Sequence, residues 1–70
     1  MRWILAKSEF IRAYSYDPRQ QILRVRFKNG RVYDYRDIGS RLFAEFVNSD
    51  SQGAFLNQHI KPDREYKMVA

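Results

Sequence analysis

The chain has 70 residues, a net charge of +5 and no cysteine. This length accommodates a single domain, and the missing cysteines exclude disulfides and zinc–thiolate sites. The longest N-terminal apolar run, Trp3 to Ala6, is far shorter than the ~20 residues of a membrane-spanning helix and too short for the core of a signal peptide. We therefore expect a cytoplasmic protein that forms a monomer and does not enter a membrane.

Positive charge is concentrated in the first half of the chain. Residues 1–36 contain nine Lys or Arg and three acidic residues, a balance of +6, whereas residues 37–70 have a balance of −1. Because long-range attraction depends on where charge is placed, we expect a polyanionic partner to meet the first half.

Three antiparallel strands are predicted in this basic half. The first, Phe10 to Tyr16, is rich in β-branched and aromatic residues and ends at a turn signal, Asp17-Pro18. The second, Gln21 to Lys28, has one apolar and one cationic face, because apolar and basic residues alternate along it. The alternating residues are Leu23, Val25 and Phe27 on one face and Arg24, Arg26 and Lys28 on the other. The third strand, Arg31 to Arg36, follows Asn29-Gly30, a strong hairpin signal.

Two registers are open for this hairpin, and they place the tyrosines of the third strand on different faces. A two-residue loop puts Tyr33 and Tyr35 on the cationic face. A three-residue loop, Lys28 to Gly30, puts both in the core and sets Arg24 opposite Asp34. We favour the second register because it stacks apolar neighbours and pairs opposite charges. The cationic face is then rich in arginine and poor in aromatic rings.

Two helices are predicted in the second half. Ser40 to Asn48 carries one apolar stripe, and Ser51 to Ile60 follows a serine-rich break and ends at Lys61-Pro62. The tail from Asp63 either packs back on the domain or adds a short edge strand. We therefore predict an α+β fold, a three-stranded antiparallel meander followed by two short helices packed on one face.

The ordered pattern of residues resembles the KTSC domain family, named for a domain at the C-terminus of some lysyl-tRNA synthetases and also found as small stand-alone bacterial proteins. The resemblance covers about residues 8–66, and Met1 to Lys7 lies outside it. It departs from the family at Gly39, where proline is usual, and at Leu56, where phenylalanine is frequent. The matching residues are Ser8-x-x-Ile11, Tyr16-Asp17, Leu23-x-Val25-x-Phe27, Gly30-x-x-Tyr33-x-Tyr35, Ile38, Phe43, Ser51-x-Gly53, Phe55-Leu56-Asn57 and His59-Ile60.

The resemblance carries no catalytic residue to this chain. The family is one of unknown function, and RNA binding has been suggested for it from its association with a synthetase. This implies RNA as a candidate partner.

Three residues outside the basic strands have both a structural and a functional interpretation. His59 is the only histidine, and without a second ligand at a suitable spacing we expect a helix-end residue instead of a metal ligand. Asn57 either contacts a ligand or ties the helix to its preceding loop. Gly53 indicates a close helix approach or an anion site at a helix start. We expect no metal, no cofactor and no enzymatic activity, since no acid–base pair or activated nucleophile is evident.

The cationic strand face is the strongest functional signal, and we expect Arg12 and Tyr14 of the first strand to lie beside it. Arginines and rings on a sheet can hold single-stranded RNA through phosphate contacts and base stacking. We therefore predict a nucleic-acid-binding module, with RNA as its ligand. A protein-interaction module without nucleic acid is the alternative, and a metal-independent ribonuclease is a minor third class. The predicted binding residues are Arg12, Arg24, Arg26, Lys28 and Arg31.

Overall fold

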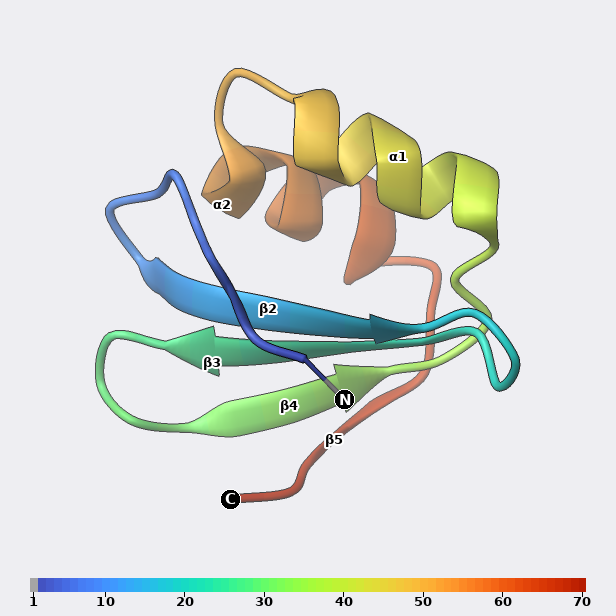
Figure 1. The fold of residues 1–70 in the computed structure, drawn as a ribbon, viewed down its shortest axis with the longest axis horizontal. Helices are drawn as coiled ribbons and strands as arrows, with labels where there is room; N and C mark the ends of the chain where they lie inside the picture. Colours follow the sequence, from blue (N-terminus) through green and yellow to red (C-terminus); the bar gives the residue numbers. More distant parts are fainter. Residues whose placement is uncertain (1) are drawn as a thin grey trace.

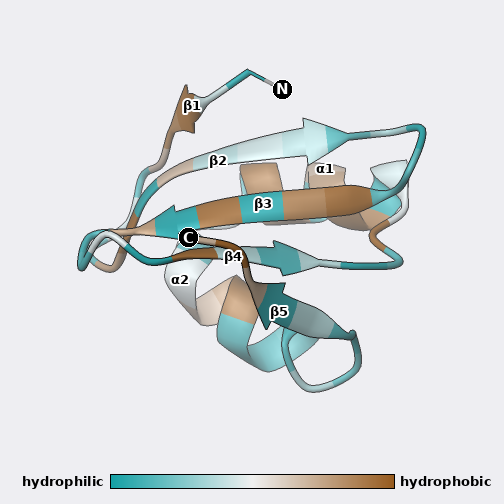
Figure 2. Cartoon of the chain, turned by 90° about the horizontal axis from the view of Figure 1, so that it is seen from below, coloured by the Kyte–Doolittle hydropathy of each residue, from teal (hydrophilic) through white to brown (hydrophobic). Residues whose placement is uncertain are grey.

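The computed structural model describes residues 2–70 and has two layers, an antiparallel sheet and a helical layer that covers one of its faces (Figure 1). The five strands form a single meander in the order β1-β2-β3-β4-β5. The other face of the sheet has no helix over it, as Figure 2 shows from that side. The elements are β1 (Ile4–Leu5), β2 (Ile11–Asp17), β3 (Ile22–Phe27), β4 (Val32–Tyr35), α1 (Ser40–Asn48), α2 (Gln52–Phe55), the π-helical turn η1 (Leu56–Ile60) and β5 (Tyr66–Met68).

The β3–β4 hairpin has the three-residue loop. Gly30 has a φ of +92°, and its N–H donates to the carbonyl of Phe27, whose own N–H donates to Arg31. Glycine fits here because a positive φ is unfavourable for residues with a Cβ. The register pairs Tyr33 with Val25 and sets Arg24 opposite Asp34, which confirms the favoured pairing of the two strands.

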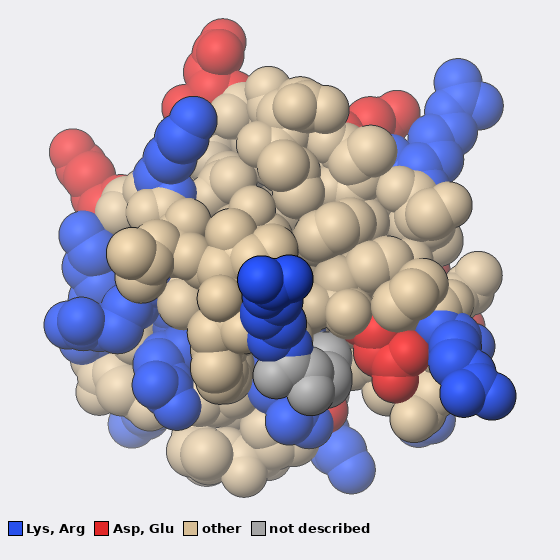
Figure 3. All heavy atoms as spheres, viewed as in Figure 1, with Lys and Arg blue, Asp and Glu red and all other residues tan. Residues whose placement is uncertain are grey.

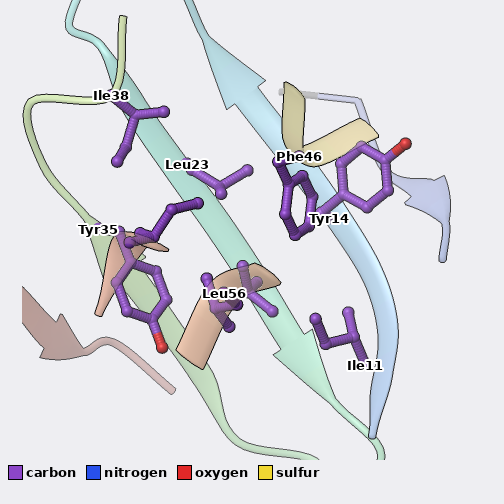
Figure 4. Packing of buried hydrophobic residues seen from close by; sticks show 9 residues of the cluster. Ile11, Tyr14, Leu23, Tyr35, Ile38, Phe46 and Leu56 are labelled. Atoms are coloured by element: carbon purple, nitrogen blue, oxygen red, sulfur yellow. The ribbon is translucent and has the colours of Figure 1, made fainter. Parts of the chain in front are cut away.

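The core lies between the helix-covered face of the sheet and α1, α2 and η1. Its buried residues point toward one another in Figure 4 and come from every layer of the domain. Phe46 of α1 packs edge-on against Tyr14, with ring centroids 5.2 Å apart. The hydroxyl of Tyr16 donates to the carbonyl of Ile38 at 2.6 Å. The polar end of this ring, at the border of the core, is therefore hydrogen-bonded. The buried cluster comprises Ile11, Tyr14, Leu23, Val25, Tyr35, Ile38, Phe46, Leu56 and Ile60.

The predicted helices are both present, and the second differs in form. α1 has the predicted bounds and buries Phe46 from the predicted apolar stripe. The second helix is α-helical only over α2 and then widens into η1. A Cβ on Gly53 would lie 3.0 Å from the Ser8 Oγ, so the predicted close approach is real and is made to the β1–β2 connection.

The prediction of three strands was wrong in number. β5 adds the edge strand that was one of the two possibilities for the tail, and it pairs Lys67 with Asp34. β1 was not predicted, because a strand of two residues, Ile4–Leu5, is too short to show an alternating pattern. The meander therefore gains one strand at each edge.

Candidate nucleic-acid interface

The uncovered face of the sheet is called the open face here. Residues directly opposite one another in antiparallel strands share a face, so the register defines its members. Arg24 lies opposite Ser15 and Asp34, and Arg26 lies opposite Ala13 and Val32. Lys67 of β5 joins them because it pairs with Asp34. Two of the five predicted binding residues, the arginines of β3, are thus brought together on this face.

Arg24 is held by Asp34. Its Nε donates to one carboxylate oxygen of Asp34 at 2.7 Å, and its Nη2 donates to the other at 2.9 Å. The side chain of Asp34 is 9% exposed and that of Arg24 is 36% exposed. The hydrogen bonds to Asp34 raise the pKa of Arg24 above its ordinary value. A bidentate pair of this kind orients the guanidinium and neutralises its charge.

Arg26 lies two residues farther along β3 and stacks on a tryptophan. Its guanidinium carbon is 4.7 Å from the centre of the Trp3 ring, a contact that contributes about 0.5–1 kcal/mol at an exposed position. The Trp3 residue remains 41% exposed. The open face therefore presents an aromatic ring next to a positive charge that has no carboxylate partner among residues 2–70.

The other three predicted residues lie at the end of the sheet where β3 turns into β4. Lys28 lies in the turn, Arg31 directly follows it, and both are exposed; the Lys28 N–H donates to the carbonyl of Phe10. Arg12 is exposed at the irregularity of β2 that faces this end. In Figure 3, Lys and Arg side chains gather at the left of the molecule, the side on which Figure 1 shows this turn. The positive charge therefore continues from the open face around the end of the hairpin.

Two sequence expectations about aromatic residues require correction. Tyr14 does not lie beside the arginines, because it pairs with Val25 and is 3% exposed within the core. The open face is also less poor in rings than the hairpin alone implied, since Trp3 reaches it. Trp3 was missed because it precedes the predicted strands, and its position depends on β1 pairing with β2.

Asn57 and His59, the two polar residues singled out in the second predicted helix, both lie in η1. His59 is exposed, and its ring lies 4.8 Å from that of Phe55. Asn57 is exposed on η1, and no side-chain hydrogen bond of Asn57 occurs within residues 2–70. Within the same residues, no group of three His, Asp or Glu side chains is placed to hold a metal ion. No helix in this part of the chain has the length and hydrophobicity needed to cross a membrane.

The chain is similar to small proteins and to parts of larger ones. It is 36% identical over 62 residues to an uncharacterised protein of Stutzerimonas stutzeri, covering 89% of this chain and 87% of that protein. It is 30% identical over 64 residues to a lysine–tRNA ligase of Nostoc, where the match covers 91% of this chain and 11% of the ligase.

The fold matches that of a solved structure over nearly the whole chain. A crystal structure of a KTSC domain protein from Yersinia pestis superimposes with a TM-score of 0.90 at 24% identity, covering 99% of this chain and 97% of that one. At this identity the likeness establishes the fold. The family model of the KTSC domain matches residues 7–66. The chain therefore belongs to the KTSC domain family.

Proposed function

We propose that this KTSC domain binds single-stranded RNA across the open face and around the β3–β4 turn. The observation that carries the proposal is the exposed Trp3 ring beside Arg26 on a sheet face with no helix over it. A ring can stack on a base while neighbouring cations contact the phosphates, which is the combination used for unpaired strands. The proposed role is binding without catalysis.

The distribution of charge supports this proposal. Arg24 is neutralised by Asp34, so the phosphate contacts are assigned to Arg12, Arg26, Lys28 and Arg31. Neutralising about four phosphates on a single strand gives a slope of about −3 in log K against log salt, at ~0.7 per phosphate. A fourfold rise in salt then weakens binding about fiftyfold.

The relatives also favour an RNA ligand. The lysine–tRNA ligase of Nostoc contains a segment similar to 91% of this chain, and a ligase of that name acts on tRNA. A domain joined to such an enzyme is well placed to contact the same RNA.

The test is a fluorescence anisotropy titration of a short labelled single-stranded RNA with the intact protein. Trp3→Ala removes the stacking ring and is expected to weaken binding about 5- to 150-fold, the range for loss of one base–aromatic stack. Trp3→Phe retains a ring and is the matched variant, with a smaller loss. No binding at about 50 mM salt, or equal affinity of Trp3→Ala and wild type, would overturn the proposal.

A charge-matched pair of variants locates the binding face. Arg26→Gln removes one positive charge from the open face. Arg41→Gln removes one from α1, where Arg41 is exposed on the helical layer. Binding is expected to weaken and to lose about 0.7 of the salt slope only in Arg26→Gln. An equal effect of both variants would indicate attraction by net charge alone.

A protein-interaction module is the second candidate function, favoured by apolar exposure around β1. Leu5 is 82% exposed and Phe10 is 66% exposed, and β1 is an edge strand of the sheet. Edge strands and exposed apolar groups are common contact surfaces. Capture of one partner protein after nuclease treatment, lost in Leu5→Ser/Phe10→Ser, is the outcome that supports this candidate.

A further inference from the structure

A second polar feature of the open face lies at the end opposite the β3–β4 turn. It is a pocket of about 290 Å³ formed where β3, β4 and β5 meet the β2–β3 turn. The register explains why its walls are polar, since Arg24, Asp34 and Lys67 lie in one row across three strands. Arg36 follows on the same side of β4, and Asp17 and Gln20 close the end of the pocket.

The carboxylates of this pocket are already engaged. Both carboxylate oxygens of Asp34 accept hydrogen bonds from Arg24. The Asp17 Oδ1 accepts the N–H groups of Arg19 and Gln20, at 3.0 and 3.3 Å, which fixes the β2–β3 turn.

Two cations in the pocket have no such partner. Arg36 and Lys67 are exposed, and neither forms a salt bridge within residues 2–70. The pocket thus presents two free positive charges beside a guanidinium of fixed orientation. A phosphate monoester carries about −1.5 to −2 at neutral pH and accepts several hydrogen bonds, so it matches this set of donors better than a phosphodiester with a single negative charge.

We propose that this pocket binds the terminal phosphate of a nucleic-acid strand lying on the open face. This proposal rests on the proposed function, which supplies the nucleic-acid strand. The pocket and the Arg26–Trp3 contact lie on the same face with Arg24 between them, so one strand can reach both. Arg36 and Lys67 contact the phosphate oxygens. Arg24, which Asp34 holds in place, forms the wall between the pocket and the rest of the open face.

The test compares one RNA sequence with a 5′-phosphate, with a 3′-phosphate and with hydroxyl groups at both ends. Wild-type protein is expected to bind one phosphorylated form about fivefold more tightly than the hydroxyl form, the gain from two exposed ion pairs. Arg36→Gln/Lys67→Gln is expected to abolish this ratio. Arg41→Gln on α1 is the charge control and is expected to retain it.

Asp17→Asn is expected to change the ratio of affinities for phosphorylated and hydroxyl RNA in the opposite direction. It removes a negative charge from the wall and keeps the Oδ1 acceptor of the β2–β3 turn, so the ratio is expected to rise. Equal affinity for all three RNAs in wild-type protein overturns the proposal, and so does an unchanged ratio in Arg36→Gln/Lys67→Gln.

Inorganic phosphate separates this proposal from the proposed function. In an NMR titration at constant ionic strength, with chloride as the reference, phosphate is expected to shift the backbone signals of Arg36 and Lys67. If no RNA binds and these signals shift, the open face fails as an RNA surface and the pocket stands as a site for a free phosphate compound. If phosphate moves nothing, the pocket proposal is overturned whatever RNA does.

Discussion

The salt bridge between Arg24 and Asp34 contributes to the stability of the domain and neutralises one arginine of the open face. Asp34→Asn tests both effects. Asparagine keeps the shape of the side chain and one acceptor, and it loses the charge and the second acceptor. Arg24 donates two hydrogen bonds to Asp34, at 2.7 and 2.9 Å. Asparagine can accept only one of them, so the variant loses the other. Hydrogen bonds to charged groups contribute about 1.5–3 kcal/mol each.

The exposure of the pair reduces this contribution. The side chain of Asp34 is 9% exposed, and that of Arg24 is 36% exposed and partly screened by solvent. We therefore expect Asp34→Asn to lower the free energy of unfolding by about 2 kcal/mol. For a domain of this size that loss lowers Tm by roughly 8–16 °C.

Urea unfolding followed by circular dichroism measures the loss, with Asp50→Asn as the control. Asp50 is exposed beyond the end of α1 and has no salt bridge within residues 2–70, so its variant changes net charge alone. Asp34→Asn is also expected to bind RNA more tightly than Asp50→Asn, because it removes the carboxylate that neutralises Arg24 on the open face. Equal urea midpoints for the two variants would refute the assignment of stability to the pair.

Three further outcomes follow from single residues. Gly30→Ala is expected to lower the free energy of unfolding by about 1–2 kcal/mol, because φ is +92° there. Gly39→Ala is expected to be near neutral in the same urea assay, because Gly39 has a φ of −69° and open space around it. Burial, with smaller effects of the neighbouring tyrosines, raises the pKa of Tyr35 to about 12. The free energy of unfolding is therefore expected to be unaffected by this group well below pH ~10 and to fall by about 2 kcal/mol as the pH rises from ~10 to ~12, and Tyr35→Phe is expected to lack that decline in urea unfolding at each pH. The Ser15 hydroxyl is buried without a hydrogen-bond partner in the described part of the chain. Ser15→Ala is therefore expected to raise the free energy of unfolding by about 1 kcal/mol, and a lower Tm would contradict this.

The hairpin was predictable from the sequence because its register is determined by neighbours in sequence. Pairing Leu23 with Tyr35 and Val25 with Tyr33 brings apolar groups together, and the same register sets Arg24 against Asp34. Local chemistry at Gly30 and the burial of one strand face favour the same answer. The positions of Tyr33 and Tyr35 on the core side follow from it.

The edges of the sheet were less predictable, because they depend on contacts between distant segments. β1 has two residues and β5 has three, so neither shows a period from which a face can be assigned. Trp3 and Lys67 reach the open face only through these pairings. The sequence therefore identified the basic strand of the candidate interface and missed the ring and the second cation that the edges contribute.

The two arginines of β3 illustrate why charge on a strand face overstates binding capacity. They alternate identically in the sequence, yet Arg24 is neutralised by a carboxylate and Arg26 lies over a ring. A neutralised guanidinium can contact phosphate only by sharing its donors, whereas Arg26 can exchange its contact with Trp3 for a phosphate and leave the ring for a base. Binding energy is therefore expected to concentrate at Arg26 and at the turn, with Arg24 acting through the geometry of the face.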